Sequence, residues 1–391
     1  MKKPCLMYLC VLLCINGGTA TRPEALGRSP DGSEAWGYVE VRPKAHMFWW
    51  LYRSPYRVED PSKPWPVILW LQGGPGASGV GIGNFQEVGP LDTYLKPRNS
   101  TWLKKADLLF VDSPVGAGYS FVEESGLYVR SDGEAADDLT ALLKEVMGRD
   151  ETLRRSPLFI VAESYGGKIA VKLGLSLTHS LNPPILHLGG VVLGDSWISP
   201  EDFVLSWGPL LNYVARLDDK DLEESNSLAQ KIKKQLEDGL YFEATESWME
   251  IQSMLSSKTN SVVRWGGSSN AVFTVMQGDF MRPRIDEVNE LLAKGVNVTI
   301  YNGQLDVICS TRGVEAWLHK LKWEGLQEFR RMDREPIFCG DDNKATRGFT
   351  KSHKNLSFYW ILGAGHFVPV DEPCVALKMV EEITKSPSTI S

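Results

Sequence analysis

One segment of the chain has the residue pattern of a catalytic serine. In residues 157–168, PLFIVAESYGGK, an apolar run leads to Ser164, and the small residues Ala162 and Gly166 stand two positions before and after it. A strand, a tight turn and a helix in this order would raise the serine hydroxyl above the edge of a sheet, as in a nucleophile elbow. Because Ala162 takes the place of the usual first glycine, a plain turn serine is the alternative interpretation of this segment alone.

A serine nucleophile needs a base and an acid that orients that base. Asp306 follows the apolar run at residues 298–301, and His366 lies in a glycine-rich loop after the apolar run at residues 358–362. The chain order serine, aspartate, histidine is one in which such triads occur. The other histidines have no cysteine, histidine or aspartate partner at metal-ligand spacing. We therefore predict a triad of Ser164, Asp306 and His366, and neither a metal ion nor a cofactor.

A second glycine-rich segment, WLQGGPG at residues 70–76, follows another apolar run. Its backbone N–H groups are able to face a substrate oxygen and to stabilise the negative charge that develops there. On this segment alone, a simple turn of glycine and proline is an equally good interpretation.

The elements that must position these residues are short apolar runs that alternate with helical patterns. The predicted strands are residues 37–41, 47–52, 67–71, 108–111, 158–161, 191–193, 298–301 and 358–362, and the predicted helices are residues 135–147, 168–178, 311–321 and 375–384. The last six strands have the composition of strands buried on both faces, and the first two indicate an antiparallel edge. The sequence therefore predicts an α/β fold with a mainly parallel central sheet and helices on both faces.

Residues 200–282 interrupt this alternation because they are helical and polar in pattern. We interpret them as a helical cap insertion that lies over the carboxyl edge of the sheet, where α/β proteins place their sites.

The composition excludes several classes of function. The chain has 391 residues, of which 43% are hydrophobic and 23% charged, and this indicates a folded protein. The net charge of −7 argues against a nucleic-acid partner, because phosphate contacts need a basic face. After the first apolar run, no stretch reaches the ~18 apolar residues that a membrane span needs.

Residues 1–20 have the pattern of a secretory signal peptide. Lys2 and Lys3 precede a short apolar run, and Gly18 and Ala20 follow it at the spacing that a signal peptidase recognises. We therefore predict a signal peptide at residues 1–20, a catalytic domain at residues 21–391, and a secreted or lysosomal location.

The secretory pathway also allows disulfides and N-linked glycans. Cys309, Cys339 and Cys374 follow the predicted signal peptide, so at most one intramolecular disulfide forms and one thiol is left. Three acceptor patterns for N-glycosylation begin at Asn99, Asn297 and Asn355.

Seven ordered motifs together resemble the serine carboxypeptidases. They are WLQGGPG (70–76), FQEVGP (85–90), DSPVGAGYSF (112–121), ESYGGK (163–168), GDSW (194–197), NGQLD (302–306) and GAGHFVPVDEP (363–373). The resemblance covers nearly the whole chain after residue 20. It implies an α/β-hydrolase fold with a helical insertion, and an enzyme that removes C-terminal residues from peptides in acidic compartments.

The resemblance implies a role for each residue of the predicted triad. Ser164 would be the nucleophile, His366 the general base and then the general acid, and Asp306 the residue that orients the histidine. The backbone N–H groups of Gly74 and Tyr165 would form the oxyanion hole.

The resemblance also implies how the terminal carboxylate of a substrate is held. An ionised glutamate would repel that carboxylate, and the family therefore pairs two acids that share one proton. Two close carboxyl groups raise one pKa, so such a pair binds an anion best at acidic pH. The corresponding residues here are Gln72, Gly73, Glu163 and Glu87.

The sequence departs from the family pattern at four places. Gln72 stands where most of the family has asparagine, Ala77 replaces a common cysteine, and Phe367 replaces a common methionine. We expect the bulkier Phe367 to narrow the preference to smaller leaving residues. The segment 200–282 is also shorter than in relatives.

Two alternatives to a carboxypeptidase stay open at this point. A triad alone does not separate hydrolysis from acyl transfer to an alcohol or amine, and acyltransferase relatives of the family exist. A shortened cap is also compatible with a secreted binding or stabilising protein of weak catalytic power. The expected partners are peptides with a free C-terminus, and the oligomeric state is open.

Overall fold

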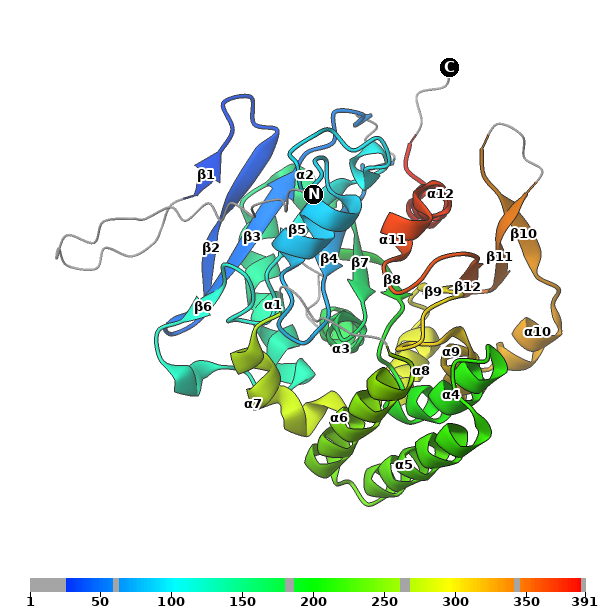
Figure 1. Cartoon of the computed structure of the whole chain (residues 1–391). Coiled ribbons are helices and arrows are strands. Elements are labelled where there is room, and N and C mark those ends of the chain that lie inside the picture. Colours follow the sequence, from blue (N-terminus) through cyan, green and yellow to red (C-terminus); the bar gives the residue numbers. More distant parts are fainter. Residues whose placement is uncertain (1–25, 59–62, 180–185, 261–267, 341–344, 388–391) are drawn as a thin grey trace, which may run out of the picture.

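The computed structural model describes residues 26–58, 63–179, 186–260, 268–340 and 345–387. Within these residues the strands form one twelve-stranded sheet in the order β1-β2-β3-β5-β4-β7-β8-β9-β12-β11-β10, with β6 paired to β3 (Figure 1). The strands are β1 (Gly27–Arg28), β2 (Glu34–Arg42), β3 (Ala45–Tyr52), β4 (Val67–Leu71), β5 (Asp107–Val111), β6 (Phe121–Val122), β7 (Pro157–Glu163), β8 (His187–Gly194), β9 (Val298–Gly303), β10 (Glu335–Phe338), β11 (Thr346–His353) and β12 (Leu356–Ile361).

The centre of the sheet is parallel. The strands β5, β4, β7, β8, β9 and β12 pair in parallel along this part of the sheet. Every residue of β4 and β5 is buried, as expected for strands that are covered on both faces. These six strands contain the six apolar runs that the sequence predicts as buried, so this prediction is confirmed.

Antiparallel strands flank the parallel centre on both sides. β2 pairs with β3, and β3 with β5, which confirms the predicted antiparallel edge. At the other edge β11 pairs with β12 and β10 with β11, in an arrangement that the sequence analysis did not predict. The reason is that β11, TRGFTKSH, has a single buried residue and contains no apolar run.

Helices cover both faces of the sheet (Figure 1). On one face Leu69 and Leu71 of β4 share a hydrophobic core with α1 (Asp132–Gly148), α3 (Gly166–His179) and α8 (Ile285–Ala293). On the other face Ile68 and Trp70 share a second core with the π-helix η1 (Gly79–Val88), the 3-10 helix η2 (Trp102–Lys104) and the helices α11 (Val368–Asp371) and α12 (Pro373–Thr384). Successive side chains of β4 point to opposite faces of the sheet, so this one strand contributes residues to both cores.

The predicted helices coincide in position with helices of the structure. Residues 135–147, 168–178 and 375–384 lie within α1, α3 and α12. The predicted helix at 311–321 is α9 (Thr311–Leu318), which ends three residues earlier because the chain closes there with bonds from Lys320 N to Trp317 O and from Leu321 N to Leu318 O. Three short elements complete the fold: η3 (Ser125–Leu127), α2 (Glu151–Arg155) and α10 (Leu326–Arg331).

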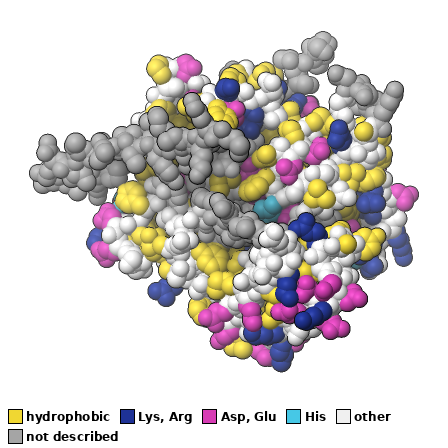
Figure 2. Space-filling model, in the orientation of Figure 1, with side chains coloured by type: hydrophobic (Ala, Val, Ile, Leu, Met, Phe, Trp, Pro, Cys, Tyr) yellow, Lys and Arg dark blue, Asp and Glu magenta, His cyan; other side chains and the backbone are white. Residues whose placement is uncertain are grey.

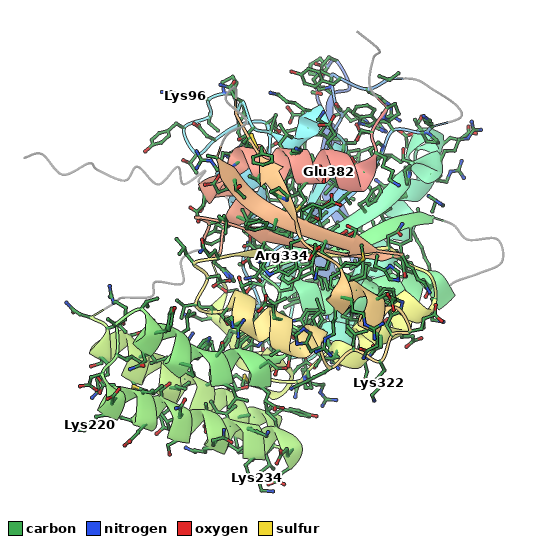
Figure 3. All side chains as sticks on the ribbon, turned by 90° about the vertical axis from the view of Figure 1, so that its right-hand side faces the viewer. Lys96, Lys220, Lys234, Lys322, Arg334 and Glu382 are labelled. Atoms are coloured by element: carbon green, nitrogen blue, oxygen red, sulfur yellow. A yellow bond between two sulfur atoms is a disulfide. The ribbon has the colours of Figure 1, made fainter. Side chains whose placement is uncertain are left out.

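The described part of residues 200–282 consists mainly of helices, joined by short turns. Its helices are α4 (Pro200–Tyr213), α5 (Asp219–Glu237), α6 (Tyr241–Lys258) and α7 (Asn270–Phe280). Figure 3 shows α5, which carries the labelled Lys220 and Lys234, standing away from the sheet together with its neighbours. α4 contacts α5 and α9, α5 contacts α6, and α6 contacts α7.

A disulfide links Cys339, just after β10, to Cys374 in α12, and Cys309 is a buried free thiol. This confirms that three cysteines allow one bridge and leave one thiol. The predicted signal peptide at residues 1–20 lies outside the described residues. Among the residues that are described, no helix has the length and apolar character to cross a membrane.

Candidate active site

The turn after β7 places Ser164 in the geometry of a nucleophile elbow. Ser164 has a φ of 56°, in the left-handed region that non-glycine residues rarely adopt. The helix α3 begins two residues later at Gly166, where an added Cβ would lie 2.4 Å from the carbonyl oxygen of Leu71. A glycine is therefore required at 166, and the strained serine conformation is held by the packing of α3 against β4.

Asp306 and His366 meet at the same edge of the sheet. Asp306 follows β9 and His366 follows β12, and both strands run parallel to β7 through β8. The Nδ1 atom of His366 lies 2.7 Å from Oδ2 of Asp306. Burial lowers the pKa of His366, but the Asp306 carboxylate outweighs burial, so that the pKa is raised above its usual value.

The backbone also fixes the Asp306 carboxylate from the other side. Its Oδ1 atom accepts hydrogen bonds from the N–H groups of Ile308 at 2.9 Å and Cys309 at 3.2 Å. In the described part of the chain a hydrogen bond joins His366 to Asp306, but no hydrogen bond joins Ser164 to His366. Catalytic hydrogen bonds are often long before a substrate is bound, so a triad does not require this bond to be present here.

The segment Gln72–Gly74 passes directly over Ser164. A Cβ added to Gly73 would lie 2.5 Å from Cβ of Ser164 and 2.9 Å from the backbone nitrogen of Tyr165. Gly74 has a φ of 108° and precedes Pro75 in a cis peptide bond. These glycines bring the backbone of one loop against that of the elbow, which is the arrangement that a two-donor oxyanion hole needs.

Two buried carboxyl groups lie next to this loop. Glu163 is the last residue of β7, Glu87 is in η1, and we call them the acid pair. Glu163 Oε1 accepts a hydrogen bond from Gln72 Nε2 at 2.7 Å, whereas Glu163 Oε2 and both oxygens of Glu87 are buried without a donor. Burial raises the pKa of Glu87 to about 7 and raises that of Glu163 well above its usual value, with Glu87 adding to the rise. Such a pair shares a proton at acidic pH.

The structure gives a reason for glutamine at position 72. Its Oε1 atom accepts a hydrogen bond from the indole Nε1 of Trp70 at 2.7 Å, while its Nε2 atom donates to Glu163. The long side chain therefore reaches Glu163 and satisfies a buried tryptophan at once. Of the other departures from the family pattern, Ala77 is buried, and Phe367 is 39% exposed beside the ring of His366.

A buried group of opposite charges, which sequence reasoning missed, lies on the α1 and α7 side of the elbow. We call Asp132, Lys168, Asp279 and Arg284 the balanced cluster. Lys168 Nζ lies 3.0 Å from Oδ2 of Asp279, and Arg284 makes two hydrogen bonds to Asp132, of 2.5 and 2.6 Å. The hydroxyl of Tyr165, next to Ser164, donates to Asp279 Oδ2 at 2.6 Å. The cluster therefore ties the end of α7 to the elbow.

Asp195 is a second site residue that sequence reasoning left without a role. It follows β8 directly, as Asp306 follows β9 after a short turn, and it is fully buried. The signal was present in the sequence, because an aspartate after a predicted buried strand is expected at the carboxyl edge of the sheet.

A cavity of about 250 Å³ opens beside Ser164 and Gly74. Its other lining residues come mostly from α6, α7 and the loop after β9, and they are Trp197, Trp248, Met249, Gln252, Ser268, Asn270, Phe273, Phe280 and Ile308. The helical segment therefore supplies an apolar wall next to the nucleophile.

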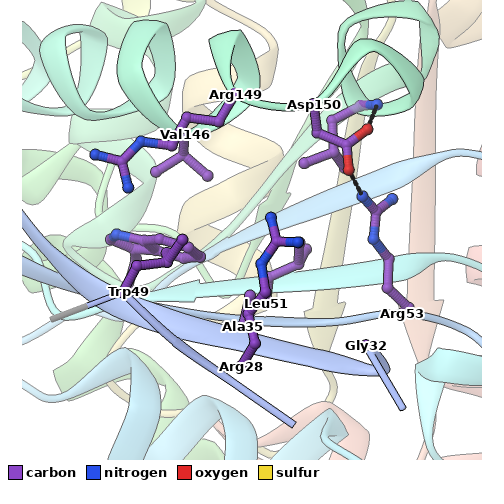
Figure 4. A pocket seen from close by; sticks show the side chains of 11 residues that line it. Arg28, Gly32, Ala35, Trp49, Leu51, Arg53, Val146, Arg149 and Asp150 are labelled. Carbon is purple, nitrogen blue, oxygen red and sulfur yellow. Dashed lines mark hydrogen bonds and ion pairs between the residues drawn. The ribbon is translucent and has the colours of Figure 1, made fainter. Parts of the chain in front are cut away.

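A second cavity, of about 100 Å³, lies between the strands β1 to β3 and the helices α1 and α2 (Figure 4). It contains arginine side chains, but Arg53 is bound to Asp150 at 2.5 Å and Arg149 to Glu145 at 2.8 Å. It contains none of the predicted site residues, and we assign it no role.

The three predicted glycosylation sites differ in the freedom of their side chains. Asn99 is exposed in a turn. Asn297 is also exposed, and its Nδ2 donates to Gly189 O at 3.2 Å. Asn355 is half-buried, and its Nδ2 donates to Leu292 O at 3.0 Å and Val296 O at 2.8 Å. Both Nδ2 hydrogens of Asn355 are thus used within the protein, so Asn99 is the most accessible acceptor of the three.

Comparisons with known proteins agree on one family. A family model described as serine carboxypeptidase matches residues 23–243 and 241–386. The chain is 60% identical to serine carboxypeptidase-like 51 of Arabidopsis thaliana over 98% of both chains. It is 39% identical to the retinoid-inducible serine carboxypeptidase of Mus musculus over 97% of both chains.

A solved structure supports the fold. Kex1Δp, a prohormone-processing carboxypeptidase from Saccharomyces cerevisiae, matches with a TM-score of 0.79 and 19% identity, over 90% of this chain and 91% of that one. Together with the parallel centre of the sheet, this confirms the predicted α/β-hydrolase fold.

The comparisons also show that this chain is shorter than the alignment with its Arabidopsis relative. The alignment with the Arabidopsis protein runs over 456 positions, 65 more than the 391 residues of this chain, so at least that many positions have no counterpart here. The two parts of the family match meet at residues 241–243, where α6 begins. In this chain α5 and α6 are joined by a tight turn in which Gly239 has a φ of 74° and Leu240 N donates to Gln235 O at 2.8 Å.

Proposed function

Because the chain belongs to the serine carboxypeptidase family, we propose that it releases C-terminal amino acids from peptides through a Ser-His-Asp acyl-enzyme mechanism that is favoured at acidic pH. The observation that carries the proposal is the buried acid pair of Glu87 and Glu163 beside Ser164. A general hydrolase has no need of two unpaired buried carboxyl groups next to its nucleophile. A carboxypeptidase needs such groups, because it must bind the terminal carboxylate of its substrate next to the nucleophile.

The chemistry would proceed in two halves. Ser164 Oγ attacks the last peptide carbonyl while His366 takes its proton, and the oxygen that becomes negative is stabilised by the N–H groups of Gly74 and Tyr165. The C–N bond then breaks as His366 gives the proton to the leaving amine. Water enters, gives a proton to His366 and attacks the acyl-serine. His366 then returns this proton to Ser164 Oγ as the bond between Oγ and the acyl carbon breaks, which releases the shortened peptide and restores the free serine.

The acid pair would set the pH dependence of this reaction. A protonated carboxyl group donates a hydrogen bond to the substrate's carboxylate, and Gln72 and Gly73 would hold the carboxylate from the adjacent loop. The pKa values of both glutamic acids are raised, mainly by burial. Binding is therefore strong below the raised pKa values and is lost as the pH rises through them.

We propose that α4 to α7 form a cap over the site, and that the residues before the scissile bond bind in the apolar cavity beside Ser164. The cavity wall from Trp248, Phe273 and Phe280 supports this, since apolar side chains would be buried against it. Neither acyl transfer nor a catalytically weak binding role has a feature of the described site in its favour.

We also propose that the protein passes through the secretory pathway to the lysosome or the extracellular space, and that Asn99, Asn297 and Asn355 are glycan acceptors, with Asn99 the most accessible. The residue pattern at 1–20 and the disulfide between Cys339 and Cys374 support this route, because disulfides persist in oxidising compartments.

The test is release of the C-terminal amino acid from N-blocked dipeptides between about pH 4 and 8. We expect acid-favoured release that falls by about 10⁴-fold in Ser164→Ala, because the triad then lacks its nucleophile. Ser352→Ala, at an exposed serine of β11, is the control and should be unchanged. If the folded wild-type protein released no amino acid, the carboxypeptidase proposal would be overturned, and an added alcohol or amine acceptor would then test acyl transfer.

A further inference from the structure

The turn after β8 holds a buried carboxyl group that the proposed mechanism does not use. Asp195 has no exposed surface and a φ of 40°. Its Oδ1 atom accepts a hydrogen bond from Gly303 N at 2.8 Å, at the end of β9. Its Oδ2 atom is buried without a hydrogen-bond partner among the described residues. A buried polar atom with no partner costs stability, so its retention needs an explanation.

The turn that contains Asp195 forms hydrogen bonds with β9 and with the elbow at Ser164. Asp195 N donates to Tyr301 O at 2.9 Å, and Trp197 N donates to Ser164 O at the same distance. Asp195 is thus fixed between the elbow and the strand that leads to Asp306. Gly303, which donates to Asp195, also accepts a hydrogen bond from Asp306 N at 3.2 Å, so one glycine joins the two aspartates, and the charge of Asp306 acts on Asp195.

One of these two carboxyl groups must carry a proton. Asp195 is fully buried and Asp306 is 3% exposed, and two adjacent carboxylates would repel each other strongly in such a setting. Asp306 receives hydrogen bonds from Ile308 N and Cys309 N and is paired with His366, so three partners already face its two oxygens. Asp195 receives only the bond from Gly303 N, so the proton belongs on Asp195, and Oδ2 is the atom free to carry it.

We propose that Asp195 is a positioning residue whose protonated carboxyl group donates a hydrogen bond from Oδ2 to Asp306 and so holds Asp306 against Nδ1 of His366. A carboxylate offers about four acceptor positions, and the backbone and His366 occupy three of them on Asp306. Asp195 supplies the fourth. The proposal rests on the triad of the proposed function and names a residue on which that triad depends.

The electrostatic surroundings agree with a neutral Asp195. Burial, and then the charge of Asp306, raise the pKa of Asp195 well above its usual value, and Glu87 adds to the rise. The neighbours Glu163, Tyr301 and Cys309 also have pKa values raised, mainly by burial, so none of them adds a charge beside Asp195 at acidic pH. His366 is the cation that can form closest to this group, and it is already paired with Asp306.

Two substitutions of Asp195 distinguish the need for a hydrogen-bond donor from the need for a carboxyl group. In Asp195→Asn the amide oxygen can accept from Gly303 N, and the amide nitrogen can donate to Asp306 without titrating. In Asp195→Ala the donor is lost. We expect Asp195→Asn to keep kcat within about threefold of wild type, and Asp195→Ala to lose about 10- to 100-fold in kcat with KM nearly unchanged.

The matched control is Asp107→Asn. Asp107 is equally buried, but it lies at the start of β5, where Ser54 N donates to it and Arg53 and Arg57 pair with it. This variant should lower the melting temperature and leave kcat unchanged. A purely structural role of Asp195 would make its variants behave in the same way as Asp107→Asn.

A measurement without substrate keeps this proposal separate from the proposed function. The NMR signal of the His366 Nδ1 proton reports its bond to Asp306, and we expect it to persist in Asp195→Asn and to shift or disappear in Asp195→Ala. A folded Asp195→Asn that lost this signal, or an Asp195→Ala that kept both the signal and kcat, would overturn the positioning role. If Asp195→Ala does not fold, Asp195→Asn alone decides. An inactive wild-type protein that showed the expected signals would overturn only the carboxypeptidase proposal.

Discussion

Two buried groups of charged residues lie beside Ser164, and they differ in how the charges of their carboxyl groups are compensated. The acid cluster consists of Glu87, Glu163, Asp195 and Asp306. Among the described residues its one salt bridge is that of Asp306 with His366, and Arg98 also acts on Glu87 through its charge. The balanced cluster, Asp132, Lys168, Asp279 and Arg284, has one cation for each carboxylate. Burial is nearly complete in both, so the difference lies in the pairing of charges.

This difference appears in the pKa values. Burial raises the pKa of Asp279, but Lys168, Tyr165 and Arg284 outweigh burial, so that it ends below its usual value. The pKa values of Glu87, Glu163 and Asp195 are all raised, because burial outweighs the interactions that oppose it. A buried carboxyl group without a cation is costly, and its presence marks a site where a proton is needed. The balanced cluster, in contrast, is suited to holding the helical segment on the elbow.

The largest effect should come from breaking the balanced cluster. Lys168→Met keeps the length of the side chain but removes the cation between Asp279 and Asp132. Because an unpaired charge is left in the interior, we expect the free energy of unfolding to fall by about 3–5 kcal/mol in urea denaturation. Lys231→Met is the control, since its partner Glu250 at 2.8 Å is exposed and such a pair contributes about 0–1 kcal/mol. Equal losses in the two variants would contradict the assignment of a structural role to the cluster.

The acid pair should make the folded protein more stable at acidic pH than at neutral pH. A carboxyl group with a lowered pKa, such as Asp279, has the opposite effect. The pKa of Glu87 rises from 4.5 to about 7 on folding, mainly through burial. A raised pKa stabilises the folded protein fully below about pH 4.5, and this contribution is lost as the pH rises through about 7. It corresponds to about 3 kcal/mol, since one pKa unit is about 1.4 kcal/mol.

Glu87→Gln should remove most of this dependence. We expect the variant to be more stable than the wild type at about pH 8 and no more stable than it at about pH 4.5, as measured by urea denaturation at both values. A variant with the same slope of stability against pH as the wild type would show that Glu87 does not hold the proton.

The sequence predicts the fold well where burial makes the residues uniform. The six apolar runs of the parallel centre were predicted because strands covered on both faces contain few polar residues. β10 and β11 were missed because β11 has a single buried residue and has the composition of a polar segment. The same argument explains why Ser164, Asp306 and His366 could be predicted together: three residues that follow parallel strands must meet at one edge.

The rest of the site depends on contacts between residues that are far apart in the chain, and such contacts leave no local pattern in the sequence. Glu87 reaches Glu163 from a π-helix that the sequence analysis did not predict, and only the family resemblance pointed to it. Lys168 and Asp279 are 111 residues apart and are brought together by the packing of α3 against the end of α7. Asp195 had a signal, its place after a buried strand, but the role proposed for it depends on Gly303, which joins it to Asp306 in the folded chain.

The smallest effect should come from Glu163→Gln, and it tests directly whether the acid cluster exists to bind an anion. The amide is neutral at every pH and keeps a donor for the substrate's carboxylate. We therefore expect KM at acidic pH within about threefold of wild type, and a smaller rise in KM between about pH 5 and 8, with kcat little changed. Glu87 still ionises in this variant, so the rise should shrink further when Glu87→Gln is added.

A substrate with a C-terminal amide provides the matched control for Glu163→Gln. It lacks the anion that the ionised pair repels, so its KM should vary little with pH in either protein. Were the free acid and the amide to show the same pH dependence of KM, the proton on the acid pair would serve something other than carboxylate recognition. The unpaired burial of Glu87 and Glu163 would then have to be explained in structural terms, as for the balanced cluster, even though neither of them has a cation in contact.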